Sequence, residues 1–255
     1  MKKILQVLLF SFVFSSLLNA QNSPQFKFDE ANEILEKGEY NNALSVYREI
    51  EETDFVSGAL YLNMAIAAVQ VDSLGLAKYY FKKASIFDDV EPKATKALEF
   101  VNSQFSRQSA KLPKLPWDKA VDILKETPGV FGLFSVGFVF LIATIALVIV
   151  RWFRIIVLPK HTNILVTTGI ISLLIFVLSF YVDYVDNRYS EAVLVIEETS
   201  VMERPSTDAS LISKAYEGYD LTVDYKKSGT EPSWYYIRLG NGQYGWIKVD
   251  GVKVL

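Results

Sequence analysis

The chain has 255 residues, of which 51% are hydrophobic, and a formal net charge of -3. It contains no cysteine, which excludes a disulfide scaffold, a thiolate metal site and a cysteine nucleophile. Acidic residues outnumber basic ones in both polar parts, residues 21–128 and 183–255, so neither offers a basic patch and we expect no nucleic-acid partner.

The chain begins with a segment typical of a secretory leader. Lys2 and Lys3 precede an apolar run over residues 4–18, and Ala20 stands where such a leader is cut. Residues 1–20 are therefore predicted to be a signal peptide that is cleaved after Ala20. An uncleaved membrane anchor is the alternative.

An internal repeat of 34 residues follows the leader. This offset is the period of the tetratricopeptide repeat, a pair of antiparallel helices. Small residues let two helices approach closely, and an aromatic residue one turn later fills the gap behind them. We therefore predict an all-α, tetratricopeptide-like helical array over residues 25–106, closed by a capping helix over residues 92–105. Two helical hairpins that are alike by chance are the alternative. The matched pairs are Ala31 and Ala65, Ala43 and Ala77, Tyr47 and Phe81, and Ile50 and Ala84.

The resemblance to tetratricopeptide domains also implies candidate groove residues. Some of these domains hold a partner's C-terminal carboxylate with Asn and Lys side chains, and Asn32, Asn63 and Lys93 align with three such positions. Amide and ammonium groups bind a carboxylate through charge-assisted hydrogen bonds. Phe28 and Ala97 replace the other two polar positions. The alternative, ordinary polar residues beside a groove, therefore stays open.

Residues 107–128 are predicted to be a juxtamembrane linker, because their prolines end the helical repeat. Within this linker, residues 119–125 are expected to form a short amphipathic helix on the outer membrane–water boundary, with Trp117 as its anchor. A plain tether is an equal alternative.

Two apolar stretches without a charged residue, 130–150 and 162–182, are each about as long as a bilayer crossing. The loop between them, residues 151–161, is basic and has no acidic residue, which favours the cytoplasmic side. Together with the leader, this pattern predicts a two-helix transmembrane hairpin in the bacterial inner (cytoplasmic) membrane, with both polar parts extracytoplasmic, in the periplasm. A re-entrant pair or a buried helical hairpin is the alternative. The basic residues that carry the argument are Arg151, Arg154 and Lys160.

From residue 190 to residue 255 the pattern changes to alternating, β-branched and aromatic segments separated by turn residues. Five or six short strands in this length predict a small all-β barrel. The tail resembles the bacterial SH3-like domain, because Trp234, Gly242 and Gly245-Trp246-Ile247 fit its pattern of a tryptophan, a turn and a Gly-Trp-Ile segment. We expect Gly245 to let the backbone kink, so that the indole lies over the barrel wall. The strand segments are residues 192–196, 221–223, 234–239, 244–249 and 252–255.

Four aromatic residues of this tail are candidate partner-binding residues: Trp234, Tyr235, Tyr244 and Trp246. Together they could form an aromatic groove for an extended peptide. The alternative is that most of them complete a small core, and for Trp246 this is the favoured interpretation. The resemblance implies that the tail binds wall peptides or protein segments, and it does not choose between them.

No combination of side chains points to catalysis. The single histidine, His161, lies beside Lys160 in the predicted cytoplasmic loop, and the chain has no Gly-rich phosphate loop and no metal-ligand spacing. We therefore expect a non-enzymatic protein with no cofactor and no metal.

The order of leader, tetratricopeptide array, two spans and SH3-like tail resembles the BatE family, the tetratricopeptide/SH3-like members of bacterial aerotolerance (Bat) operons. The resemblance covers the whole chain by architecture. It implies an adaptor or scaffold in a stress-linked membrane complex with Bat proteins that carry von Willebrand factor A domains and, indirectly, with a MoxR-type ATPase. The lipid bilayer is the other expected partner. The alternative function is cell-wall sensing or anchoring, in which the SH3-like domain binds peptidoglycan peptides.

Overall fold

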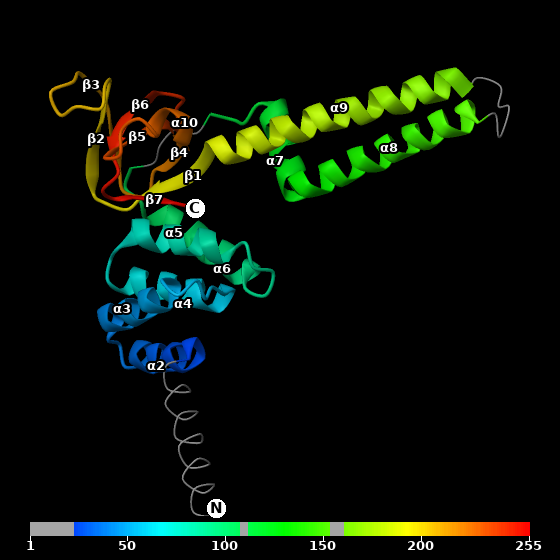
Figure 1. The fold of residues 1–255 in the computed structure, drawn as a ribbon. Coiled ribbons are helices and arrows are strands. Elements are labelled where there is room, and N and C mark those ends of the chain that lie inside the picture. The colour runs from blue at the N-terminus through cyan, green and yellow to red at the C-terminus, as the bar shows by residue number, and fades with distance from the viewer. Residues whose placement is uncertain (1–22, 108–111, 154–160) are drawn as a thin grey trace, which may run out of the picture. The chain divides into compact units, whose positions relative to one another are not determined.

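The computed structural model describes three stretches of the chain, residues 23–107, 112–153 and 161–255 (Figure 1). The predicted signal peptide lies outside the described residues, as do Arg154 and Lys160 of the predicted cytoplasmic loop.

The described residues form two compact units. The first combines the N-terminal helices with most of the C-terminal strands, and we call it the array–module unit. The second contains the two long apolar helices, and we call it the hairpin unit. The array–module unit comprises residues 23–107, 191–223 and 231–255, and the hairpin unit comprises residues 112–153, 161–190 and 224–230.

Five helices form the N-terminal array, as predicted. The two helices of the first pair begin at Pro24 and Tyr40, and those of the second pair begin 34 residues later. The hydroxyl groups of Ser23 and Ser57 cap the first helix of each pair by accepting a backbone N–H. The helix starts therefore repeat with the same period as the core residues. The helices are α2 (Pro24–Glu36), α3 (Tyr40–Glu51), α4 (Gly58–Gln70), α5 (Leu74–Ala84) and α6 (Glu91–Gln104).

The residues matched by the repeat are the core of this array. All eight side chains of the four matched pairs are buried, and the alanines among them are completely inaccessible. The Tyr47 ring packs 6.0 Å from that of Phe28. Along the array, α2 contacts α4 and α4 contacts α6, so the first helices of successive pairs lie next to one another.

The C-terminal module is a seven-stranded sheet in the order β3-β2-β6-β5-β4-β1-β7, which confirms the predicted all-β domain. The strand pairs β1–β7, β2–β3, β2–β6, β4–β5 and β5–β6 are antiparallel. A single helical turn, α10 (Tyr225–Ser228), follows β4. The strands are β1 (Tyr189–Leu194), β2 (Glu198–Met202), β3 (Leu211–Tyr216), β4 (Asp220–Asp224), β5 (Trp234–Leu239), β6 (Tyr244–Lys248) and β7 (Val252–Val254).

The expectation of five or six strands was too low. The segments that sequence reasoning missed are β2 and β3, which carry polar residues where a simple strand pattern would place apolar ones. β3 lies at one end of the strand order, pairs with β2 and leaves Leu211 54% exposed. A strand with a single neighbour needs fewer buried side chains, which is why its sequence signal is weak.

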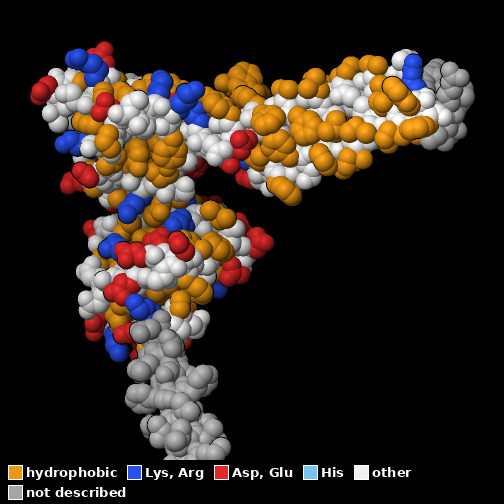
Figure 2. Space-filling view, in the orientation of Figure 1, with side chains coloured by type: hydrophobic (Ala, Val, Ile, Leu, Met, Phe, Trp, Pro, Cys, Tyr) orange, Lys and Arg blue, Asp and Glu red, His pale blue; other side chains and the backbone are white. Residues whose placement is uncertain are grey.

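The hairpin unit contains α7 (Pro116–Glu126), α8 (Gly129–Trp152) and α9 (His161–Arg188). At 1.5 Å per residue the 24-residue α8 is about 36 Å long, more than the roughly 30 Å of a bilayer's hydrocarbon core. Only 11% of the apolar stretch of either long helix is buried, whereas the core helix of a soluble domain is mostly buried. Figure 2 shows hydrophobic side chains along the visible face of this hairpin. Both helices are long enough and apolar enough to cross a membrane.

Small and hydroxyl-bearing residues line the contact between α8 and α9. The Ser172 hydroxyl donates to the Gly137 carbonyl oxygen at 2.9 Å, and the Thr144 hydroxyl lies 3.0 Å from that of Thr168. A Cβ atom on Gly137 would lie 3.2 Å from the Ile175 side chain, so even an alanine there would require the neighbouring side chain to shift. Close approach and interhelical hydrogen bonds are the forces that hold helices together in lipid.

Candidate binding surfaces

The inner face of the array carries a polar cluster built from both predicted asparagines. Asn32 lies on α2 and Asn63 on α4, and these two helices are in contact. The Asn32 side-chain oxygen accepts hydrogen bonds from the Asn63 amide at 2.8 Å and from the Tyr47 hydroxyl at 2.7 Å. Burial of Tyr47 raises its pKa to about 12, so the hydroxyl stays protonated and acts as a donor.

The structure brings together two of the three residues predicted to hold a carboxylate. Lys93 is exposed on α6 and takes no part in the Asn32–Asn63–Tyr47 cluster. The Asn32 oxygen is already occupied by two donors, so any ligand would meet mainly amide N–H groups. The cluster therefore suits an acceptor, such as a carbonyl or a carboxylate, without a paired ammonium group.

Two exposed apolar residues extend this surface, and sequence reasoning missed them. Ile66 on α4 and Phe100 on α6 are 39% and 58% exposed. They follow Asn32 at successive intervals of 34 residues, so the three side chains occupy equivalent positions in successive first helices. The repeat offset could have found them. A ligand on this face would meet apolar side chains beside the amide cluster.

The second candidate surface is one face of β5 and β6. The register pairs Trp234 with Lys248, Tyr236 with Trp246, and Arg238 with Tyr244. Because side chains alternate along a strand, these six share one face of the sheet. The Tyr236 ring lies 5.3 Å from that of Trp246, edge to face, and 6.1 Å from that of Tyr244, stacked. The Arg238 guanidinium lies 5.8 Å from the centre of the Tyr244 ring.

One of the four predicted aromatic residues lies on the wrong face. Tyr235 pairs with Ile247 and packs against the module's core, on the side opposite Trp246. Tyr236 takes the place that was predicted for Tyr235. The two-residue period of a strand could have shown this, because only every second residue from Trp234 can share its face.

Trp246 does not complete the core, although that was its favoured interpretation. It is half-buried on the aromatic face and is absent from the module's core cluster. Gly245, its neighbour, is buried, and a Cβ atom there would lie 2.5 Å from the Val201 side chain and 2.9 Å from the Met202 carbonyl oxygen. The glycine is therefore required by the close approach of β2. The kink expected at this glycine stays a prediction.

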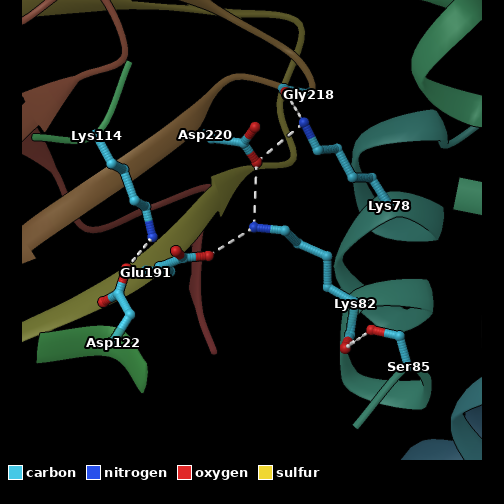
Figure 3. A network of polar contacts seen from close by, with 8 residues as sticks. All are labelled: Lys78, Lys82, Ser85, Lys114, Asp122, Glu191, Gly218 and Asp220. Carbon is cyan, nitrogen blue, oxygen red and sulfur yellow. Dashed lines mark hydrogen bonds and ion pairs between the residues drawn. The ribbon is translucent and has the colours of Figure 1, made fainter. Parts of the chain in front are cut away.

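A network of charged groups centred on the buried Lys78 joins the array to the module within their common unit (Figure 3). The ammonium group of Lys78, on α5, donates to the Gly218 carbonyl oxygen at 2.6 Å and lies 3.0 Å from an Asp220 oxygen. Lys82, one turn later, lies 2.9 Å from Glu191 and 3.3 Å from Asp220. Burial of an ammonium group is tolerated only with such partners.

Apolar contacts and close backbone approaches reinforce this interface. Val193 of β1 belongs to the hydrophobic core of the array. The backbone N–H of Gly75 donates to Glu217 at 2.7 Å. Gly218 has a φ of +79°, and a Cβ atom on it would lie 2.3 Å from the Phe105 ring. The interface therefore fixes the two candidate surfaces on one body, which no local sequence pattern indicated.

A pocket of about 350 Å³ lies at this interface, beside the end of α6 and strands β2 and β3. Three of its charged side chains already have partners. Glu217 accepts from Gly75, Glu198 pairs with Lys214, and Arg107 lies over the Tyr216 ring. These contacts make the three side chains less available to a ligand. Within residues 23–107, 112–153 and 161–255, no group of three His, Asp or Glu side chains could hold a metal ion.

Comparison with known proteins identifies one part of the chain. Residues 186–253 match the family model described as the GW (Gly-Tryp) dipeptide domain, which covers about a quarter of the sequence. The C-terminal sheet is thus a GW, SH3-like domain, and Gly245-Trp246 is a Gly-Trp dipeptide within it. In a comparison with curated proteins, no sequence matches the chain at a significant level.

Proposed function

We propose that the protein is a non-enzymatic adaptor of the bacterial inner membrane. In this proposal the apolar hairpin spans the bilayer, and the helical array and the GW module face the periplasm as one binding platform. One observation carries it: the array and the module pack into a single compact unit, although the apolar hairpin separates them in the sequence.

This packing bears directly on membrane topology. The chain leaves the array–module unit after α6, passes through α8 and α9, and re-enters the same unit at β1. Lys78 and Gly218 can make a direct hydrogen bond only if both parts lie on the same side of the membrane. An even number of crossings satisfies this requirement, and two apolar helices supply it. The basic residues of the connecting loop then favour the cytoplasmic side for the tip of the hairpin.

The array is proposed to bind protein. The 34-residue period of its helices and core supports a tetratricopeptide-type array, whose usual ligands are peptides. Its inner face offers the Asn32–Asn63 amide cluster next to the exposed apolar side chains of Ile66 and Phe100. A segment of a partner protein with a carbonyl or carboxylate beside an apolar side chain fits this surface.

The proposed setting is a Bat-type stress or aerotolerance complex. The order of leader, array, hairpin and SH3-like tail is what the resemblance to BatE proteins rests on, and the GW match supports its last segment. The proposed partners are membrane proteins with von Willebrand factor A domains and, through them, a MoxR-type ATPase.

A second candidate function is recognition of the cell wall. The observation that favours it is the aromatic face of the GW module, where Tyr244 is 51% exposed beside Tyr236 and Trp246. Stacked aromatic side chains with a neighbouring arginine offer flat contact surfaces to an extended wall peptide.

Photocrosslinking in intact cells separates the two functions. A photoreactive residue is placed in the full chain at Ile66 in the array, at Tyr244 in the module, or at Lys37, an exposed control position. The adaptor function predicts defined protein adducts from Ile66, including proteins with von Willebrand factor A domains, and none of these from Lys37. Wall fragments captured at Tyr244, with Ile66 matching the control, would favour wall binding instead. Identical adducts from all three positions would contradict both.

A further inference from the structure

We infer that α7 is a membrane-interface helix that lies among the lipid headgroups and turns an apolar stripe toward the acyl chains. The inference rests on the proposed function, because it requires α8 and α9 to span a bilayer. It adds a second kind of membrane contact, made by an element of the linker that precedes the hairpin.

The first observation is the surface of α7 itself. None of the residues in this 11-residue helix is buried, and Trp117 and Ile123 are each 63% exposed. Trp117, Ala120 and Ile123 follow one another at intervals of three, so they form one stripe along the helix. Leu115, just before the helix, is 47% exposed as well. An exposed stripe of this kind is costly in water and favourable at an apolar boundary.

The second observation is where the helix is held within the hairpin unit. α7 contacts both α8 and α9, and two residues separate it from the start of α8. Lys125 pairs with Asp186, near the polar end of α9, at 2.7 Å. These contacts fix α7 beside the end of the hairpin where α8 begins and α9 ends. If the hairpin spans a bilayer, that end lies where hydrocarbon gives way to headgroups.

The third observation is the exposed apolar surface of the hairpin, which begins close to α7 in the chain. Phe131, in the first turn of α8, is 86% exposed, and the apolar side chains along α8 and α9 are exposed in the same way. The exposed apolar surface that lipid would cover thus starts five residues after the end of α7. Tryptophan prefers the membrane–water interface, because its ring is apolar and its N–H can bond to water or headgroups.

The charge balance of the segment indicates which lipid surface it fits. Three lysines and three acidic residues lie between Lys114 and Glu126, so the segment is neutral overall. Several of these charges are paired within the hairpin unit, as Lys114 is with Asp122 at 2.7 Å (Figure 3). Attraction to anionic lipids is therefore not the driving force. The occupant of the stripe is a zwitterionic phospholipid surface, bound through the apolar side chains.

Because the chain has no cysteine, single nitroxide labels can test this placement in the full-length protein. Ala120→Cys reports on the stripe, Asp118→Cys on the polar side of the same helix, and Phe138→Cys on the middle of α8. Each labelled protein is reconstituted into nanodiscs of phosphatidylcholine. The accessibility of the label to oxygen, which concentrates in lipid, is compared with its accessibility to a water-soluble nickel chelate.

The expected result is an oxygen-to-nickel accessibility ratio several-fold higher at position 120 than at position 118, and highest at position 138. Equal ratios at 120 and 118, with position 138 still in lipid, would overturn the inference and leave the proposed membrane hairpin standing. A label at position 120 shielded from both reagents would overturn it in favour of a protein contact. A label at position 138 that is open to nickel would refute the spanning hairpin, and this inference would fail with it.

Discussion

The array–module unit and the hairpin unit place their polar and apolar groups in opposite ways. In the array–module unit, apolar side chains fill the interior, and the buried charge of Lys78 is fully engaged by a carbonyl and a carboxylate. In the hairpin, apolar side chains lie outside, and the hydroxyls of Thr144, Thr168 and Ser172 face the helix–helix contact. Each unit follows the same rule, that polar groups need partners, and the outward apolar side chains of the hairpin fit the lipid that we propose around it.

This difference explains why each unit depends on different residues. A unit in water gains most of its stability from apolar burial, so placing a charge in its core is strongly destabilising. A hairpin in lipid gains little from apolar burial between its helices, so its hydrogen bonds and close contacts matter, and each contributes little. Mutations in the two units should therefore change the free energy of unfolding by very different amounts.

The largest expected effect is that of Tyr47→Asp. Tyr47 is completely buried between helices of the array, so the substitution removes a large side chain and places a carboxylate without a partner in the core. We expect a loss of about 4 kcal/mol or more, enough to unfold the array. Loss of helical circular dichroism and rapid proteolysis of the N-terminal part measure it. Tyr47→Phe, the matched control, should cost about 1 kcal/mol, because it loses only a hydrogen bond; similar stability for the two variants would show that residue 47 is not in the core.

The next effect separates two lysines of α5. Lys78→Ala should destabilise the array–module unit by about 3 kcal/mol, because it leaves the Gly218 carbonyl without its buried donor and Asp220 with the more distant Lys82. Lys82→Ala should cost less, about 1 kcal/mol, because its nearer partner Glu191 is exposed and Asp220 keeps Lys78. Chemical denaturation of the detergent-solubilised protein measures both. Equal losses would argue against a buried array–module interface.

An alkaline titration sharpens the comparison through buried tyrosines. Burial raises the pKa of Tyr47 and of Tyr80 to about 12, above the value of about 10 for an exposed tyrosine. The unfolded chain therefore loses these protons first, and stability that is complete below pH 10 should fall between pH 10 and 12. The loss should be about 2 kcal/mol for each of the two tyrosines by pH 12. Thermal unfolding followed across this range measures it, and Tyr47→Phe should reduce the slope. A flat stability curve up to pH 12 would contradict the burial of these hydroxyls.

The smallest effect belongs to the hairpin. Ser172→Ala removes the hydrogen bond to the Gly137 carbonyl and should weaken the pairing of α8 and α9 by about 0.6 kcal/mol. Ser135→Ala is the matched control, because that exposed hydroxyl bonds only to its own helix and its loss should have no effect. Unfolding in mixtures of a mild detergent and dodecyl sulfate measures the stability of both variants. A loss of stability for Ser172→Ala as large as that for Lys78→Ala would mean that the hairpin is packed like the core of a water-soluble domain.

The sequence alone predicted most of the fold because the decisive patterns are local. The 34-residue repeat predicted the helical array, and two uncharged stretches predicted the long apolar helices. Strands β2 and β3 were missed because Glu198-Thr-Ser and Ser213-Lys do not read as buried strands. Their pairing depends on neighbours that no short window contains.

The candidate sites were less predictable than the fold. The closeness of Asn32 and Asn63 could be anticipated because a repeat carries positions from one helix to the next, and their role in binding stays a prediction. Tyr235 was assigned to the wrong face, since choosing between it and Tyr236 requires the strand register. Lys78 drew no attention, because on α5 it resembles any surface lysine, and its partners are 140 residues or more away in the chain.

The most direct test of the proposed topology is to label single cysteines with a membrane-impermeant maleimide in bacterial spheroplasts. The exposed positions Lys37 in the array, Asn241 in the module and Trp152 near the tip of the hairpin report on the three regions. The account predicts that Lys37→Cys and Asn241→Cys are labelled in intact spheroplasts, whereas Trp152→Cys is labelled only after lysis. If the array and the module react on opposite sides of the membrane, they do not form one unit and the proposed adaptor is wrong.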